Sequence, residues 1–413
     1  NITINGGTLK TTASFTINTK RGIQLDASNS TINVDASTTL TYAGIIDHQG
    51  SETNNGYTKS GGGTFALSGD STYSGVTTIS AGVITIAHAG SLGSTSGATS
   101  ITSGAALSIS GGITVAEPIT VNGTGVSSGG AIVFTGGNNT YSGAITLGST
   151  STIVSTGGAQ TISATVNGGQ ALTITANGNL VISGAVGGST DLSSYAVTTT
   201  GSASQTFSAN VETTGNQTYT AAGGIVTSGA RTFDSSSGTV NFASALSGNN
   251  NVTVTGNADI DGAITDIAVL SISGTSNIGS DITTSGTQTY TGAVTLSANV
   301  TLTSSGDVIT FSNTVNSADS TNRNLTVTTG GDTVHINFDG IVGGSQGLGA
   351  IAITGVLDLN AAIADANSLT VSGVSLLDAD VTTSGTQTYS AAITLGTAAR
   401  TLQGTTVQTT TIN

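Results

Sequence analysis

Three aspartates within eight residues form the densest group of possible metal ligands in this chain. Asp259, Asp261 and Asp266 fall in the segment 259–266. Carboxylate oxygens are ligands that Ca²⁺ prefers, and the ion takes roughly six to eight oxygens. Neither an EF-hand loop nor a nonapeptide calcium repeat surrounds the three residues. The segment therefore predicts a solvated turn, with a calcium site as the alternative.

A second group of charged side chains lies in the segment 47–59, which lacks the alternation of apolar and polar residues seen elsewhere. Charged residues make up only 7% of the chain, so their density here is unusual. Polar segments without periodicity are typical of loops. We therefore expect a projecting loop that could bind a partner through Asp47, His48, Glu52, Tyr57 and Lys59.

Five tyrosines recur in related phrases along the chain. The phrase TTSGTQTY occurs at 283–290 and again at 382–389, and looser copies hold the other three tyrosines. A row of exposed rings could bind sugars. Burial at a corner of the fold, with the hydroxyl hydrogen-bonded at the edge, is the interpretation we favour, because these rings carry much apolar surface. These structural anchors of the repeat are Tyr73, Tyr141, Tyr219, Tyr290 and Tyr389.

No motif in the sequence indicates catalysis. The three histidines lie far apart, and neither H-E-x-x-H nor G-x-S-x-G occurs. The absence of cysteine excludes a thiolate nucleophile, a thiolate metal site and a disulfide. Glycoside hydrolysis needs two facing carboxylates, and 21 acidic residues spread over 413 positions single out no pair. We therefore expect no enzyme, no catalytic residue and no cofactor apart from the calcium alternative.

The composition also narrows the partners. Seven basic residues against 21 acidic ones give a net charge of −14, which excludes a surface that follows nucleic-acid phosphates and a polybasic membrane patch. No run of apolar residues approaches the roughly 18 that a membrane-spanning helix needs. Neither nucleic acid nor a membrane span is expected.

The elements that must position these residues are short strands. Alternations such as Val252-Thr253-Val254 and Leu325-Thr326-Val327 recur between turn clusters rich in Asn and Gly, and no segment has helical periodicity. A β-sandwich and a β-solenoid both fit short strands, and the internal repeats favour the solenoid. We predict an all-β, right-handed parallel β-helix, one continuous elongated rod over 1–413 with roughly 20–25 residues per coil. Regular Thr rows could also bind ice, but the uneven tyrosine spacing argues against that.

Part of the chain resembles a known family. The segment 61–86, GGGTFALSGDSTYSGVTTISAGVITI, resembles the autotransporter-associated β-strand repeat, and 130–147 resembles the first half of that repeat. The TTSGTQTY phrases are similar to repeats of filamentous-haemagglutinin-like bacterial surface β-helix proteins. The resemblance implies an exported β-helix on the bacterial cell surface that serves as a stalk, adhesin or fibre. It supplies no catalytic residues.

These observations predict a non-enzymatic extracellular protein with a structural or adhesive role. A carbohydrate-binding or carbohydrate-active β-helix is the alternative. The segments 1–5 and 409–413 both read as ordinary strand without a capping helix. We therefore expect either that the solenoid continues in a longer chain or that copies associate end to end into a filament. A host surface or an extracellular glycan is the other expected partner.

Overall fold

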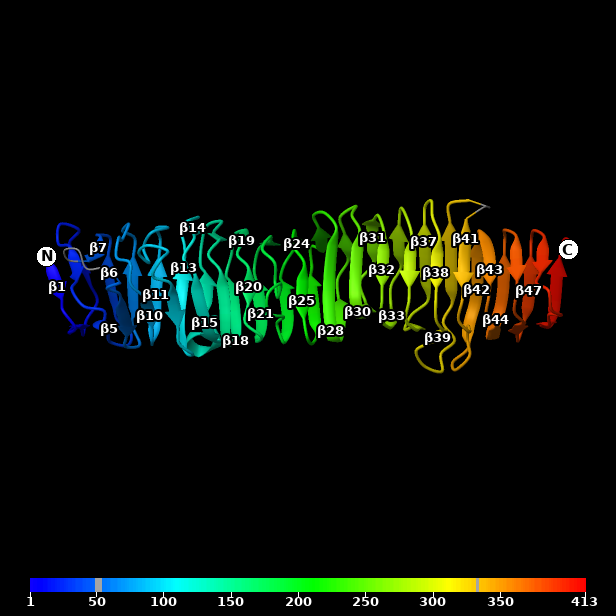
Figure 1. Ribbon diagram of the computed structural model, residues 1–413, viewed down its shortest axis with the longest axis horizontal. Coiled ribbons are helices and arrows are strands. Elements are labelled where there is room, and N and C mark those ends of the chain that lie inside the picture. Colours follow the sequence, from blue (N-terminus) through cyan, green and yellow to red (C-terminus); the bar gives the residue numbers. More distant parts are fainter. Residues whose placement is uncertain (49–53, 332–333) are drawn as a thin grey trace. The chain divides into compact units, whose positions relative to one another are not determined.

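The structure, a computed structural model, describes residues 1–48, 54–331 and 334–413. Within these ranges every regular element is a β-strand apart from one 3₁₀ turn, η1 (Val126–Ser128) (Figure 1). No helix in this part of the chain is long and apolar enough to cross a membrane. The chain forms two compact units: unit 1 comprises 1–214 and 221–223, and unit 2 comprises 215–220 and 224–413.

Unit 1 is a parallel β-solenoid, because each strand pairs in parallel with a strand one coil away. Ile17 lies beside Tyr42, Tyr42 beside Leu67, and Leu67 beside Ile86, so one buried row crosses four coils. The strands of unit 1 fall into four columns. The first column contains β1 (Ile2–Ile4), β4 (Ile23–Leu25) and β7 (Ile46–His48). The second contains β2 (Thr8–Thr11), β5 (Ser30–Val34), β8 (Tyr57–Ser60), β10 (Thr77–Ile79), β12 (Thr99–Ile101), β15 (Ile119–Gly123), β18 (Ile145–Ser155), β20 (Val166–Asn167) and β25 (Val211–Thr213). The third contains β3 (Phe15–Ile17), β6 (Thr39–Tyr42), β9 (Thr64–Leu67), β11 (Gly82–Ile86), β13 (Ala105–Ile109), β16 (Ile132–Phe134), β21 (Ala171–Ala176) and β23 (Ser194–Thr199). The fourth contains β14 (Thr114–Val115), β17 (Thr140–Tyr141), β19 (Gln160–Ile162), β22 (Leu180–Ile182) and β24 (Gln205–Phe207).

Unit 2 has the same construction. Its strands form three columns. The first column contains β26 (Gln217–Ala221), β28 (Arg231–Phe242), β30 (Val252–Ile260), β33 (Ser276–Ile278), β36 (Val294–Leu296) and β39 (Val315–Ser317). The second contains β32 (Leu270–Ile272), β35 (Gln288–Tyr290), β38 (Ile309–Phe311), β41 (His335–Phe338), β43 (Val356–Leu359), β45 (Ser375–Leu377) and β48 (Ile393–Leu395). The third contains β27 (Ile225–Thr227), β29 (Leu246–Ser247), β31 (Ile264–Ile267), β34 (Ile282–Thr284), β37 (Val300–Ser304), β40 (Leu325–Thr329), β42 (Leu348–Thr354), β44 (Ile363–Val371), β46 (Val381–Thr383), β47 (Thr386–Tyr389), β49 (Leu402–Gln403) and β50 (Thr406–Thr409). The prediction of an all-β fold built from stacked parallel coils is confirmed in both units.

The alternation in the sequence explains which side chains form the core. In β37, Val300 and Leu302 are buried, whereas Thr301 and Thr303 between them stay half-exposed. β-branched residues suit a pleated surface with one buried face, since their side chains pack well against neighbours on it. In-register stacking also aligns aromatic rings, as in the stacked pair Phe311 and Phe338, whose centroids are 4.8 Å apart.

Coil length varies more than the sequence predicted. The coil that leads from Val252 to its row neighbour Leu270 is shorter than the expected range, whereas the coil from Ile309 to its neighbour Ile336 is longer. The expected range of coil lengths is therefore too narrow. Pairing fixes only the strands, so turns lengthen or shorten without disturbing the rows.

Candidate functional site

The structure does not bring the three candidate calcium ligands together. Asp259 lies on the outward face of β30, whereas Asp261 lies exposed in the short connection 261–263 between β30 and β31. Asp266 lies exposed in β31, where its backbone oxygen accepts a hydrogen bond from the Asn249 N–H. Within the described ranges no group of three His, Cys, Asp or Glu side chains could hold a metal ion.

Asp259 instead belongs to a row of polar side chains that runs across four coils of unit 2. Register places Asn241, Asp259, Asn277 and Thr295 side by side, each one coil after the last. We call this row the polar ladder. β28, β30, β33 and β36 supply its members, and the first three of these strands are labelled in Figure 1. Sequence analysis missed Asn241, Asn277 and Thr295. The signal that would have found them is the equal spacing of all four ladder residues, Asp259 included, in the sequence.

Hydrogen bonds hold the polar ladder in place. Asn241 Nδ2 donates to Asp259 Oδ2 at 2.9 Å and to Asp261 Oδ2 at 3.1 Å. Asn277 Nδ2 donates to the other carboxylate oxygen of Asp259 at 2.8 Å, and Thr295 Oγ1 donates to Asn277 Oδ1 at 3.3 Å. Both oxygens of Asp259 are therefore oriented by neighbouring coils, while the residue stays partly open to water.

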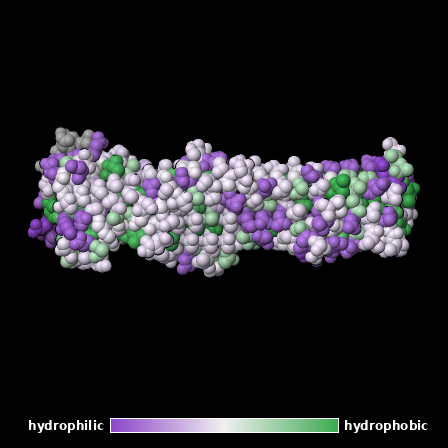
Figure 2. Space-filling view, turned by 90° about the horizontal axis from the view of Figure 1, so that it is seen from below, coloured by the Kyte–Doolittle hydropathy of each residue, from purple (hydrophilic) through white to green (hydrophobic). Residues whose placement is uncertain are grey.

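A shallow groove of about 410 Å³ lies beside the polar ladder. A second row, Thr239, Asn257 and Thr275, forms the other side; each member lies two residues before a ladder residue in the sequence. Asn257 Oδ1 accepts hydrogen bonds from Thr275 N at 3.0 Å and Thr275 Oγ1 at 2.9 Å. Asp259 is the only charged residue among the described residues that line the groove. Figure 2 shows one face of the molecule, on which hydrophilic and near-neutral residues predominate.

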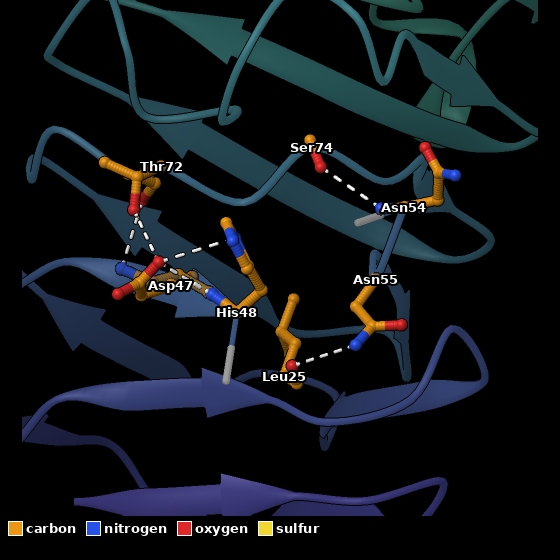
Figure 3. Close-up of polar contacts among 9 residues, drawn as sticks. Leu25, Asp47, His48, Asn54, Asn55, Thr72 and Ser74 are labelled. Atoms are coloured by element: carbon orange, nitrogen blue, oxygen red, sulfur yellow. Dashed lines mark hydrogen bonds and ion pairs between the residues drawn. The ribbon is translucent and has the colours of Figure 1, made fainter. Parts of the chain in front are cut away.

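The expected loop 47–59 is only partly a loop. Asp47 and His48 belong to β7, and Tyr57 and Lys59 belong to β8, while Glu52 lies outside the described residues. Neighbouring coils hold the described flanks (Figure 3). Asp47 Oδ1 accepts from Thr72 Oγ1 at 2.7 Å, Asn54 N donates to Ser74 Oγ at 3.1 Å, and Asn55 Nδ2 donates to the Leu25 oxygen at 3.3 Å.

Two members of the expected binding loop lie in the core, so their assignment to a binding surface is wrong. Tyr57 is 1% exposed and Lys59 is fully buried. Register explains the error: Lys59 stacks between Ile32 and Ile79 in an inward row, because the Tyr57-Thr58-Lys59-Ser60 segment alternates after all. Its ammonium donates to the backbone oxygens of Ser60, Gly61 and Ala81 at 2.8 to 3.0 Å. Burial lowers the pKa of Lys59 to about 8.

All five recurring tyrosines are buried, with at most 1% of each residue exposed. Fully buried rings cannot serve as a platform for sugars. They do not form one row either, since Tyr290 lies in β35 and Tyr389 lies in β47 of a different sheet.

The repeated phrase instead encodes a local hydrogen-bond pattern. Gln288 accepts from the Tyr290 hydroxyl at 2.9 Å, and its amide donates to Thr284 Oγ1 at 3.2 Å and to the Thr303 oxygen at 2.8 Å. Gln387 binds Tyr389, Thr383 and the Gln403 oxygen in the same way. Gln288 and Gln387 are fully buried, and the phrase together with a backbone oxygen of the following coil satisfies their polar atoms inside the core.

Glu117 is a buried carboxylate that sequence analysis did not single out. It is 3% exposed, and its Oε1 accepts a hydrogen bond from Thr99 Oγ1 at 3.5 Å. Glu117 Oε2 is buried and has no hydrogen-bond partner among the residues that the structure describes. Burial raises the pKa of Glu117 to about 7, and the Thr99 hydrogen bond opposes part of that rise. A lone Glu before Pro118 carries no sequence signal for burial, since acidic residues are usually exposed.

Comparison with known proteins agrees with the resemblance seen in the sequence. Residues 58–86 match a family model described as passenger-associated-transport-repeat. This segment runs from β8 through β11 and includes Lys59. The sequence thus resembles autotransporter repeat proteins.

A longer stretch of the chain is similar to the adhesin BmaC autotransporter of Brucella suis biovar 1 (strain 1330). The two are 33% identical over 154 residues, which cover 35% of this chain and 4% of that protein. This chain therefore spans only a small part of the length of its curated relative. No solved structure matches the chain.

Proposed function

We propose that this chain is a non-enzymatic protein of the bacterial surface with a structural or adhesive role. The observation that carries the proposal is the passenger-associated-transport-repeat match at 58–86, within a parallel β-solenoid. Similarity to an autotransporter adhesin supports the same role and an extracellular location. The matched region is a small part of that adhesin, so we do not assign the adhesin's whole activity to this chain.

The coils give this role a mechanical basis. Backbone hydrogen bonds link each strand to the next coil, and inward rows of Val, Ile and Leu stack along each unit. Pulling coils apart breaks many such bonds at once. A chain built in this way holds its outward side chains at fixed positions, as an adhesive surface requires.

Adhesion is tested with the purified chain coupled to beads. We expect coated beads to bind epithelial cells or extracellular matrix more than beads that carry a β-solenoid of unrelated sequence. Equal binding of both bead types would refute the adhesive role. The non-enzymatic part is tested by incubating the chain with polysaccharides, where release of shortened products would refute it.

End-to-end association is a further element of this proposal. The strands β49 and β50 carry exposed or half-exposed side chains, and so does β3 near the other end of the chain, where Phe15 is 47% exposed. Stacking of copies would cover these strands in the same parallel pattern that joins the coils. Electron microscopy of the purified chain is expected to show filaments several subunits long. Uniform single particles at all concentrations would refute the association.

A further inference from the structure

We infer that the groove beside the polar ladder of unit 2 is a binding site for a neutral polysaccharide chain. The inference rests on the proposed adhesive function and assigns that function a ligand class and a place. The groove lies between the polar ladder and the row formed by Thr239, Asn257 and Thr275.

The shape of the groove suits an extended polymer. Both rows advance by one coil at a time, so equivalent groups recur at about 4.8 Å, the spacing of paired strands. The coils are of equal length here, which keeps the rows straight over this stretch. A polymer lying across the coils therefore meets similar side chains along its length. The volume of about 410 Å³ falls in the range of roughly 300–1,000 Å³ typical of ligand sites.

The polar groups are held in place before any ligand binds. Asp259 is fixed by Asn241 and Asn277, and Asn257 is fixed by Thr275. Each carboxylate oxygen offers two lone pairs, so Asp259 can accept further hydrogen bonds from ligand hydroxyls. Asn257 uses its oxygen toward Thr275, which leaves its exposed amide N–H groups directed to other acceptors. Fixing these side chains in advance reduces the entropy lost on binding.

The lining also argues against other ligands. Among the described residues that line the groove there is no Lys or Arg, and Asp259 is negative, so sulfated or phosphorylated polymers would be repelled. These described lining residues are Thr, Asn, Ser, Ala and Asp, and none has a large apolar side chain, so a hydrophobic peptide finds no pocket for its anchors. Hydroxyls that both donate and accept match the amide, hydroxyl and carboxylate groups present. Neutral sugars supply such hydroxyls at every residue.

Two variants remove ligand contacts, and a third is the matched control. Asp259→Ala removes the central acceptor of the polar ladder. Thr295→Val keeps the shape of a half-exposed ladder side chain and removes only its hydroxyl. Thr326→Val makes the same change in β40, at a half-exposed position outside the groove. Far-UV circular dichroism and urea unfolding establish that each variant is folded, and Thr295→Val tests the site even if Asp259→Ala disturbs it.

The full chain is applied to an array of neutral and anionic glycans, and hits are measured by titration calorimetry. We expect binding to at least one neutral oligosaccharide series, strengthening with chain length. Affinity should fall at least tenfold in Asp259→Ala and severalfold in Thr295→Val, and stay unchanged in Thr326→Val. Binding only to anionic glycans, equal binding by all four proteins, or no binding up to millimolar concentration would overturn the inference.

The outcomes separate this inference from the proposed function. Bead adhesion without any neutral-glycan binding refutes the groove and leaves the adhesive role standing. Glycan binding that depends on Asp259, without bead adhesion, supports the groove and refutes the role in adhesion to cells and matrix.

Discussion

Replacing Glu117 with Gln should stabilise the protein at alkaline pH and have much less effect in mild acid. The carboxyl is buried, and its Oε2 has no hydrogen-bond partner in the described part of the chain. Burial raises the pKa from 4.5 to about 7 in the folded state. The folded state therefore holds a proton that the unfolded chain has lost between these two values. The protonated carboxyl makes its full favourable contribution to the free energy of unfolding below pH 4.5, and this contribution is lost as the pH rises through 7.

The size of the effect follows from the shift. A difference of about 2.5 pKa units corresponds to about 3 kcal/mol of the free energy of unfolding. Integrating the proton difference between pH 5 and pH 8.5 gives a loss of about 2–3 kcal/mol for the wild type. Gln has nearly the same shape and no charge, so Glu117→Gln should escape this loss. Any constant cost of placing an amide beside Thr99 cancels when the two pH values are compared.

The assay is urea unfolding at pH 5 and pH 8.5, followed by tyrosine fluorescence, with local hydrogen exchange of unit 1 as a second readout. The free energy of unfolding of Glu117→Gln, relative to wild type, should rise by about 2–3 kcal/mol from pH 5 to pH 8.5. Glu212→Gln is the matched control, because Glu212 lies half-exposed on β25. A relative free energy that changes by less than about 0.5 kcal/mol between the two pH values would refute the reasoning. An equal rise in the control would refute it as well.

Three further predictions use other buried groups and one turn. Burial lowers the pKa of Lys59 to about 8, so between pH 8 and 10.5 the unfolded state binds more protons than the folded state. The free energy of unfolding of the wild type, relative to that of Lys59→Met, should therefore rise by about 2 kcal/mol from pH 7 to 9.5, as measured by urea unfolding. Gln288→Leu leaves the Tyr290 hydroxyl without its acceptor and should lower the free energy of unfolding by about 1–3 kcal/mol, whereas an unchanged urea midpoint would contradict the role of this hydrogen bond. Gly82 has a φ of +67°, and an added Cβ would lie 2.4 Å from the Gly63 oxygen, so Gly82→Ala should destabilise by about 2 kcal/mol or more. Gly7→Ala meets no atom within 4 Å and should change stability by less than about 0.5 kcal/mol; similar midpoints for these two Gly variants would rule out the steric argument.

Local alternation was enough to predict the class of fold. Segments such as Val300-Thr301-Leu302 place apolar side chains inward and Thr outward, and the structure follows this pattern. The same reasoning failed for Lys59, because charge was taken as a sign of exposure. In that segment the alternation and the register outweighed the charge, and three backbone oxygens solvate the ammonium.

The sequence predicted only part of the candidate site. Clustering drew attention to Asp259 and Asp261, but their partner Asn241 lies about one coil earlier in the chain. Row neighbours lie a whole coil apart in the sequence, so the cluster at 259–266 by itself did not reveal them. Asp266, although close in sequence, lies on β31, which belongs to a different sheet from β30.

The sequence by itself determined that this chain forms short strands with apolar rows inside and Thr, Asn and Ser outside, because a period of two residues decides which face each side chain takes. Only the tertiary structure decided which outward residues become neighbours. Parallel pairing joins positions one coil apart, and the number of turn residues in that coil sets the distance in sequence. That is why Asn241, Asp259, Asn277 and Thr295 form one row, and why the tyrosine-bearing strands of the two TTSGTQTY phrases, β35 and β47, lie in different sheets.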